Sequence, residues 1–224
     1  MPRPLSAADR PVLLTGFEPF GGEPVNPSWL VAQALQGELI GGHRVQAVQL
    51  PCVFALALGA LDAARQAHQP RWVLALGLAG SRSAISVERV AVNLVDARIP
   101  DNAGAQPVDM PVVAGGPAAY FTGLPAKAIV AGLQQAGHRA ELSHTAGSYV
   151  CNQVFYGLMH ALSLGAGSGV RGGFIHLPPL PEQADCHLQS RPMALDEQVA
   201  ALRLAVEMLV ADTPELHVVG GRID

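Results

Sequence analysis

Three residues carry side chains that could together perform nucleophilic chemistry: Cys151, His176 and Glu88. Cys151 follows a short strand-like segment and stands at the start of a predicted helix. Unpaired backbone N–H groups and the helix dipole there favour a thiolate. His176 ends another apolar segment and could serve as a general base. Glu88, in a β-rich segment, could hold the imidazole in one tautomer, which completes a nucleophile, base and orienting acid.

Each of these side chains also has an ordinary structural interpretation. Cysteine is often a small buried residue, a histidine at a strand tip can be structural, and a glutamate on a strand can face solvent. The positions of Cys151 and His176 at the ends of strand-like segments favour the catalytic interpretation. The separation of 25 residues between Cys151 and His176 covers one helix and a return strand. A crossover of that length predicts that the strand before Cys151 lies beside the strand of His176.

Other residues could surround such a site. Phe17 and Phe20 flank a Glu-Pro pair after an apolar strand and could either anchor the loop or form the walls of a pocket for a small flat ring. Asn26, before a proline, is expected to cap a helix even if it also touches a ligand. Arg98 and Asp101 could pair with a buried carboxylate, line the site, or form a solvated surface pair.

Several site types are disfavoured by spacing. The glycines near residue 20 form neither G-x-G-x-x-G nor a Walker loop, which argues against a nucleotide site. Cys186 and His187, with His176 nearby, match no common zinc spacing. Ser148 lacks the G-x-S-x-G elbow of serine hydrolases. We therefore expect neither a metal nor a cofactor.

The elements that must position these residues alternate between strand and helix. We expect strands over residues 11–17, 43–51, 72–80, 85–97, 139–144 and 172–178, and helices over 27–36, 54–68, 125–137, 152–165 and 195–210. Residues 98–117, rich in Pro, Gly and Asp, are predicted to form a long loop. This order predicts an α/β fold, a three-layer α/β/α sandwich around a mostly parallel, twisted sheet. Ligands of such sheets bind at the carboxyl ends of the strands.

Composition narrows the classes of function. The chain has 224 residues, of which 50% are hydrophobic and 14% charged. We expect one domain over residues 1–224, with extensive burial and scope for a subunit interface. A net charge of −4 offers no basic surface for nucleic acid or an anionic membrane. No export signal or membrane-spanning run is evident, and three widely spaced cysteines fit a reducing cytoplasm.

Four stretches in order resemble the pyroglutamyl peptidase I family, a class of cysteine peptidases. They are "LLTGFEPFGG…NPS", "ERVAVNLVDARIPDN", "SYVCN" and "FIHLPPLP", and they extend almost from end to end of the chain. The resemblance implies removal of an N-terminal pyroglutamyl group from peptides, without metal or cofactor. It assigns Cys151 as nucleophile, His176 as base and Glu88 as orienting acid. It also implies a homotetramer.

The resemblance further implies a pocket for the lactam ring. Phe17, Phe20 and Asn26 would form it together with the turn at 77–80, and Arg98 would give electrostatic support. The family often has Gln where this chain has Leu78. We expect that position to act through its backbone. If its side-chain amide is needed, the pocket is altered.

Three alternatives stay open at this point. The chain could be a cysteine peptidase or amidase of the same fold whose ring pocket has changed, for which Leu78 is the hint. It could be a ligand-binding relic, although retention of all three catalytic residue types disfavours that. A nucleoside phosphorylase-like enzyme would share the layers but needs a phosphate site, which the sequence does not provide.

Overall fold

A twisted sheet of seven strands runs through the molecule in the computed structural model, which describes residues 10–165 and 169–220. The order across the sheet is β2-β3-β1-β4-β9-β5-β8. These strands are β1 (Val12–Phe17), β2 (Leu39–Ile40), β3 (His43–Leu50), β4 (Trp72–Leu78), β5 (Ile85–Glu88), β8 (Ala140–Ser143) and β9 (Arg171–Leu177). Pairing is parallel for β3–β1–β4–β9 and for β5–β8, and antiparallel for β2–β3 and β9–β5.

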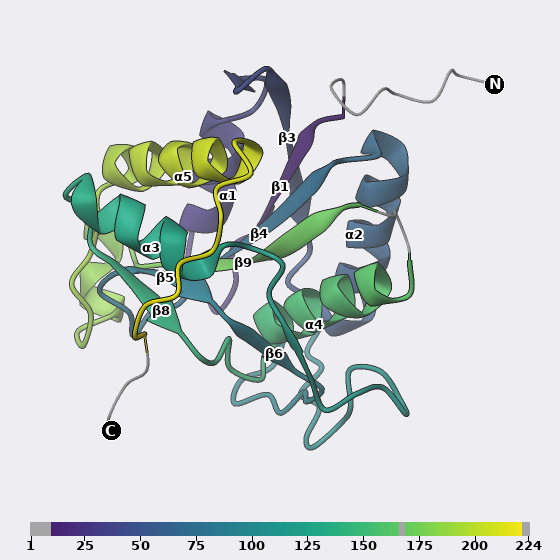
Figure 1. The fold of residues 1–224 in the computed structure, drawn as a ribbon. Helices are drawn as coiled ribbons and strands as arrows, with labels where there is room; N and C mark the ends of the chain where they lie inside the picture. Colours follow the sequence, from purple (N-terminus) through teal and green to yellow (C-terminus); the bar gives the residue numbers. More distant parts are fainter. Residues whose placement is uncertain (1–9, 166–168, 221–224) are drawn as a thin grey trace.

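Helices cover both faces of this sheet, as Figure 1 shows. One face carries α1 (Pro27–Ala34), α3 (Ala126–Gln135) and α5 (Leu195–Val210), and the other carries α2 (Phe54–His68) and α4 (Val150–Ser163). The predicted three-layer sandwich is therefore confirmed. Within the part of the chain that is described, no helix has both the length and the apolar character needed to cross a bilayer.

The two-sided burial explains the apolar run in β4. Leu74 and Leu76 pack into the core beneath α1, α3 and α5, whereas Val73 and Ala75 pack into the core beneath α2 and α4. Successive residues of a strand point to opposite faces. A strand covered on both sides therefore needs apolar residues at every position.

The segment expected as one strand over 85–97 is broken at Arg89. β5 stays in the main sheet, whereas β6 (Val90–Val92) leaves it and pairs with β7 (Ala119–Phe121) as a separate antiparallel ladder. Backbone bonds fix the break, because the Arg89 N–H donates to Ser143 O at 2.8 Å while the Arg89 carbonyl accepts from Thr122. The sequence prediction also missed β2, β7 and the 3₁₀ helix η1 (Pro181–Cys186).

The expected crossover between the strands flanking Cys151 and His176 was wrong. β8 and β9 are not neighbours, because β5 lies between them and runs antiparallel to β9. β8 consequently ends away from the edge where β9 ends. Residues 144–149 return the chain across the α2/α4 face to the start of α4.

The predicted long loop over 98–117 is confirmed. It projects from the lower side of the molecule in Figure 1, and an isolated bridge between Val95 and Met110 lies at its base. Asp101, 6% exposed, organises its first turn: one carboxylate oxygen accepts from the N–H groups of Ala103 and Ala105, and the other accepts from Phe54 at the start of α2.

Candidate active site

His176 and Glu88 are brought together by the antiparallel pairing of β9 with β5. Glu88 lies directly opposite Phe174, so both side chains point to the α4 face, as does His176 two residues further on. The Nδ1 atom of His176 lies 2.8 Å from Oε1 of the fully buried Glu88. Because a carboxylate only accepts, Nδ1 carries the proton, and Nε2 is left as the basic nitrogen.

Cys151 reaches the same place from the helical layer. It is the second residue of α4, within the helix rather than just before it, and a Cβ built on Gly77 would lie 2.8 Å from its Sγ atom. Gly77 is the register partner of His176 on the neighbouring parallel strand, about 4.8 Å away. The thiol thus rests on the strand beside the histidine. The same Cβ would lie 2.8 Å from the Phe174 ring, so a side chain at position 77 would force the thiol or the ring to shift.

The pKa of the Cys151 thiol is raised above its ordinary value. Burial is the largest cause, followed by electrostatic contributions from the neighbouring Cys52 and Glu88, and the hydrogen bond from its own backbone N–H opposes them. The expectation that the helix start would produce a standing thiolate was therefore wrong in direction. Desolvation and neighbouring negative charge outweigh the helix terminus, so Cys151 rests as a thiol.

Arg82 is a site residue that sequence reasoning missed. Its Nη2 atom lies 3.3 Å from Oε1 of Glu88 and donates to Thr145 O at 2.9 Å, while Nη1 lies 3.3 Å from Glu141. The ion-pair partner of Glu88 is thus Arg82 and not Arg98, whose residue is exposed. Only the unforeseen reversal of β5 brings the turn after β4 beside Glu88, so no local signal could have found Arg82.

Asn152 and Tyr149 anchor the start of α4 on either side of the nucleophile. The buried Asn152 amide accepts from the Val92 N–H at 3.0 Å and donates to the carbonyls of Val92 and Leu94 at 2.9 and 2.8 Å. Tyr149 donates to Pro100 O at 3.0 Å. These bonds tie the helix start to β6 and to the long loop, and so fix the position of Cys151.

The predicted ring-binding aromatics occupy two environments. Phe17 ends β1 and is only 2% exposed, within the core beneath α2 and α4. Phe20 is half-buried, and its ring centroid lies 6.0 Å from that of Tyr149, which in turn packs edge-on against Phe54 at 5.2 Å. A cluster of aromatic side chains therefore lies beside the start of α4. Phe20 was predicted to belong to it, whereas the sequence did not indicate Tyr149 and Phe54.

Asn26 is the N-cap of α1, as predicted. Its Oδ1 accepts from the Ser28 N–H at 3.1 Å, and its Nδ2 donates to Glu18 O at 3.1 Å, which fixes the loop after β1. Leu78 is 6% exposed at the end of β4. Strand alternation directs its side chain to the face opposite Gly77, away from the thiol.

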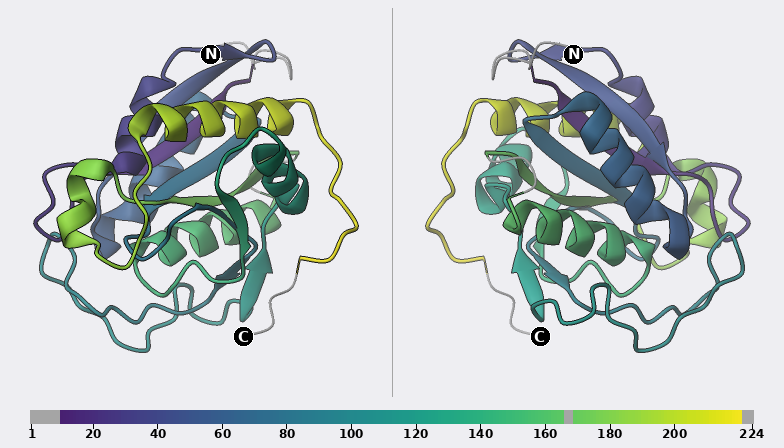
Figure 2. Two further views of the ribbon diagram at one scale, coloured as in Figure 1. Left: turned by 90° about the vertical axis from the view of Figure 1, so that its left-hand side faces the viewer. Right: turned by 90° about the vertical axis from the view of Figure 1, so that its right-hand side faces the viewer.

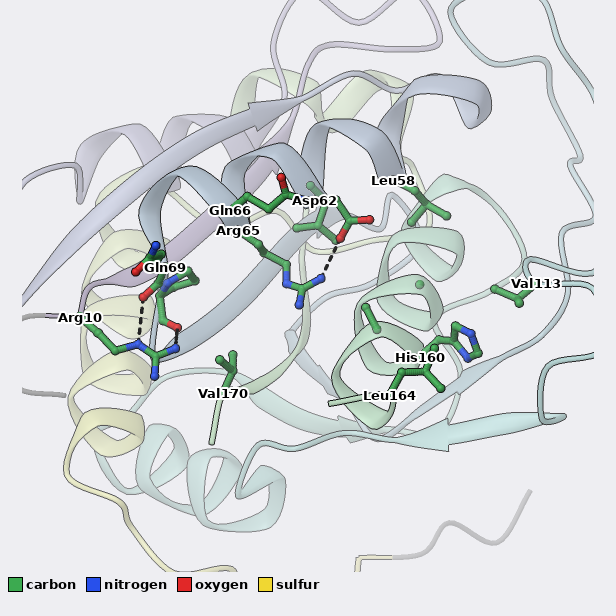
Figure 3. Close-up of a pocket in the computed structure, with 14 residues that line it drawn as sticks. Arg10, Leu58, Asp62, Arg65, Gln66, Gln69, Val113, His160, Leu164 and Val170 are labelled. Atoms are coloured by element: carbon green, nitrogen blue, oxygen red, sulfur yellow. Dashed lines mark hydrogen bonds and ion pairs between the residues drawn. The ribbon is translucent and has the colours of Figure 1, made fainter. Parts of the chain in front are cut away.

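A large cavity lies elsewhere. It is a hollow of about 990 Å³ between α2 and α4 that opens to solvent, and the residues expected at the site do not line it. Its apolar wall includes Leu58, Leu61, Leu164 and Val170 (Figure 3). At one end, Arg10 donates hydrogen bonds to the carbonyls of Gln69 and Pro70. Arg65 forms an ion pair with Asp62 on α2. Among the described residues, no group of three or more His, Cys, Asp or Glu side chains could hold a metal ion.

A cysteine at a helix start, a histidine on the adjoining strand and a buried glutamate on that histidine form the constellation of a cysteine-type hydrolase. The profile of the pyroglutamyl peptidase family matches residues 10–212. The chain belongs to the pyroglutamyl peptidase family, as its four motifs predicted.

Individual relatives agree over nearly the whole length. The pyrrolidone-carboxylate peptidase of Cupriavidus pinatubonensis is 53% identical over 214 residues, which cover 96% of this chain and 99% of the relative. The Yersinia pestis protein of the same name is 52% identical with the same coverage. Among solved structures, pyroglutamyl peptidase I from Bacillus amyloliquefaciens superposes with a TM-score of 0.90 at 44% identity, covering 94% of this chain and 99% of that one. A variant of the pyrrolidone carboxyl peptidase of Pyrococcus furiosus gives 0.86 at 41% identity, covering 90% and 98%.

Proposed function

We propose that this chain is a cysteine peptidase that removes an N-terminal pyroglutamyl (5-oxoprolyl) group from peptides by acyl transfer to Cys151. Family membership supports the reaction. The observation that carries the assignment of residues is the seating of the Cys151 thiol on Gly77, the strand neighbour of His176, whose Nδ1 is held by Glu88. No metal or cofactor enters this mechanism.

In the first half of the reaction, Nε2 of His176 takes the proton of the Cys151 thiol as sulfur attacks the pyroglutamyl carbonyl carbon. A thiol with a raised pKa makes this transfer necessary, because little thiolate stands ready. Glu88 keeps the proton on Nδ1 and stabilises the imidazolium. The imidazolium then protonates the leaving amine, the C–N bond breaks, and a thioester remains on Cys151.

In the second half, water replaces the peptide. His176 takes a proton from the water as it attacks the thioester, and the sulfur leaves, so that free pyroglutamate and the Cys151 thiol form. The oxyanion of each tetrahedral intermediate would be held by backbone N–H groups at the start of α4. No side chain caps this helix, whose N-cap is Tyr149. Its first N–H groups are therefore available as donors.

The substrate lacks a free amine, so the pocket must recognise a flat lactam with one N–H, one C=O and two methylenes. We assign its apolar faces to Phe17 and Phe20 and its polar atoms to the loop of Asn26 and the backbone of turn 77–80. The orientation of Leu78 away from Gly77 supports a backbone role at that position. Rings without the lactam groups would leave these polar atoms unpaired and bind poorly. Arg98 gives electrostatic support only.

The test is fluorophore release from pyroglutamyl-aminomethylcoumarin under reducing conditions, beside the leucyl and prolyl analogues. We expect turnover of the pyroglutamyl compound alone, and its loss in Cys151→Ala. Removal of a catalytic nucleophile costs about 10⁴-fold or more in kcat. Turnover that survives in Cys151→Ala would remove the cysteine from the mechanism, and absence of turnover in folded, reduced wild type would reject the activity.

We further propose that residues 1–224 work as a single peptidase domain in the cytoplasm and assemble as a homotetramer. All three cysteines are free thiols, which suits a reducing compartment. Val108, Met110 and Phe121 are exposed apolar side chains on or beside the projecting loop, which supports a subunit contact there. Light scattering after gel filtration gives the subunit number, and a monomer at micromolar concentration would contradict the tetramer.

A further inference from the structure

A set of contacts outside the catalytic residues joins three segments at one edge of the sheet. Loop 18–26 follows β1, the turn at 79–84 follows β4, and residues 178–187, including η1, follow β9. These three strands are parallel, so their carboxyl ends share an edge. Figure 2 shows the purple loop after β1 beside the yellow-green η1.

Glu23 links the first of these segments to the third. Its Oε1 lies 3.2 Å from Nε2 of His187, and its Oε2 accepts from Nε2 of Gln183 at 3.0 Å. The Gln183 side chain is 2% exposed and donates also to Val25 O at 3.3 Å. The Glu23 carboxylate is therefore hydrogen-bonded by Gln183 and faces the His187 imidazole, and the neighbouring Cys186 thiol also hydrogen-bonds to it.

His187 links the third segment to the second. A Cβ built on Gly80 would lie 2.3 Å from Nδ1 and 2.4 Å from Cε1 of the imidazole, so the ring rests directly on the backbone of the turn. A larger residue at position 80 would displace the ring. The other side of this turn is fixed by the Ala79 N–H, which donates to Leu177 O at 3.0 Å.

We propose that Glu23, Gln183 and His187 form a clasp that positions residues 77–80, the end of β4 and the first residues of the turn after it, against loop 18–26, and so sets the affinity for the pyroglutamyl ring. This rests on the proposed function, because those two segments are the ones assigned to ring binding. The three residues are positioning residues that act through the backbone of the turn. Their loss weakens binding in the ground state and the transition state alike, which raises KM and leaves kcat unchanged.

The experiment compares steady-state rates on pyroglutamyl-aminomethylcoumarin for wild type, Glu23→Gln and His187→Ala. Each variant changes one partner of the contact between Glu23 and His187, and we expect KM to rise about tenfold with kcat within about threefold. Alkylation of Cys151 by iodoacetamide should proceed at the wild-type rate. His187→Gln keeps an N–H donor and should hold KM within about threefold of wild type. The matched control is His217→Ala, at an exposed histidine of the C-terminal segment.

The double variant Glu23→Gln/His187→Ala tests whether the two substitutions raise KM through one shared contact or through two independent effects. If Glu23 and His187 act through one contact, Glu23→Gln/His187→Ala raises KM no further than the worse single variant. Unchanged KM in the folded single variants, or a fall in kcat at unchanged KM, would overturn the clasp. Absence of turnover in wild type would instead reject the proposed function. The isosteric Glu23→Gln keeps the test decisive if His187→Ala does not fold.

Discussion

At the scale of single residues, the surroundings of Cys151, the proposed nucleophile, oppose ionisation of its thiol. Cys151 lies at a helix start, yet burial and electrostatic contributions from its neighbours Cys52 and Glu88 raise its pKa. Cys52 itself is 3% exposed, and burial, with smaller contributions from Glu18 and Asp101, raises its pKa to about 12 against the hydrogen bond with Tyr149. The proton therefore stays on the Cys151 sulfur at rest, and the proposed mechanism needs His176 to remove it.

This predicts how alkylation of Cys151 depends on pH. In a Cys186→Ser background, which removes the exposed thiol, the iodoacetamide rate at Cys151 should rise through pH 7–9 without levelling off. Below a raised pKa, the thiolate fraction grows about tenfold for each pH unit. Peptide-level mass spectrometry measures the rate at this cysteine. A plateau reached below pH 7 would show instead a thiolate already formed in the free enzyme.

At the scale of secondary-structure elements, the site depends on how closely α4 approaches the sheet. Gly77 supplies the space for both the Cys151 sulfur and the Phe174 ring. Asn152 holds the first turn of the helix against β6. The position of the Cys151 thiol is consequently set by the space that Gly77 leaves on the sheet and by the hydrogen bonds of the Asn152 amide.

Gly77→Ala should therefore inactivate the enzyme while leaving it folded. The added methyl group displaces the thiol, and a misplacement of about 1 Å costs roughly 10²-fold in kcat. The control is Gly59→Ala in α2, where a Cβ meets no atom within 4 Å and alanine favours the helix. Rates with the pyroglutamyl fluorophore and circular dichroism test this. Near-normal kcat in Gly77→Ala would mean that the helix can move away without harm.

At the scale of the whole molecule, the long loop is attached to the sandwich through a few charged contacts. Asp101 accepts from Phe54 of α2, and Asn102 donates to Glu18 at 2.8 Å in the loop after β1. Burial acts to raise the pKa of Asp101, but hydrogen bonds from the N–H groups of Phe54 and of residues 103–105 outweigh it, and the net pKa is lowered. The ionised carboxylate thus joins distant parts of the chain.

The lowered pKa of Asp101 predicts the pH range in which the long loop loses this stabilising contact. A carboxyl whose folded pKa lies below its unfolded value, about 3.9, stabilises the fold above that pH, and the contribution disappears as pH falls through the folded pKa. Asp101→Asn should lower the free energy of unfolding by about 1–3 kcal/mol at pH 6–7, and by progressively less as pH falls below about 4. Urea titrations of both proteins at each pH measure the difference. An equal difference at pH 3 and pH 7 would rule out the charge as its cause.

Much of the fold followed from local pattern. The helices over residues 54–68 and 195–210 have the predicted bounds, because amphipathic periodicity is a property of the segment alone. The continuous apolar run of β4 predicted a strand that is covered on both faces, and the four motifs predicted the family. The residue types of the triad were equally visible, since a strand end and a helix start can be read from neighbouring residues.

The relations between strands were decided only by the tertiary structure. Nothing in residues 85–88 states that β5 runs antiparallel to β9 or lies between β9 and β8, yet that arrangement places Glu88 on His176 and Arg82 on Glu88. The raised pKa of Cys151 has the same origin, because burial and neighbouring charge come from distant segments. The sequence by itself determined which groups are proposed to perform the chemistry, since those are side-chain identities. Packing between elements decided their contacts and protonation, since distance and desolvation exist only in the folded chain.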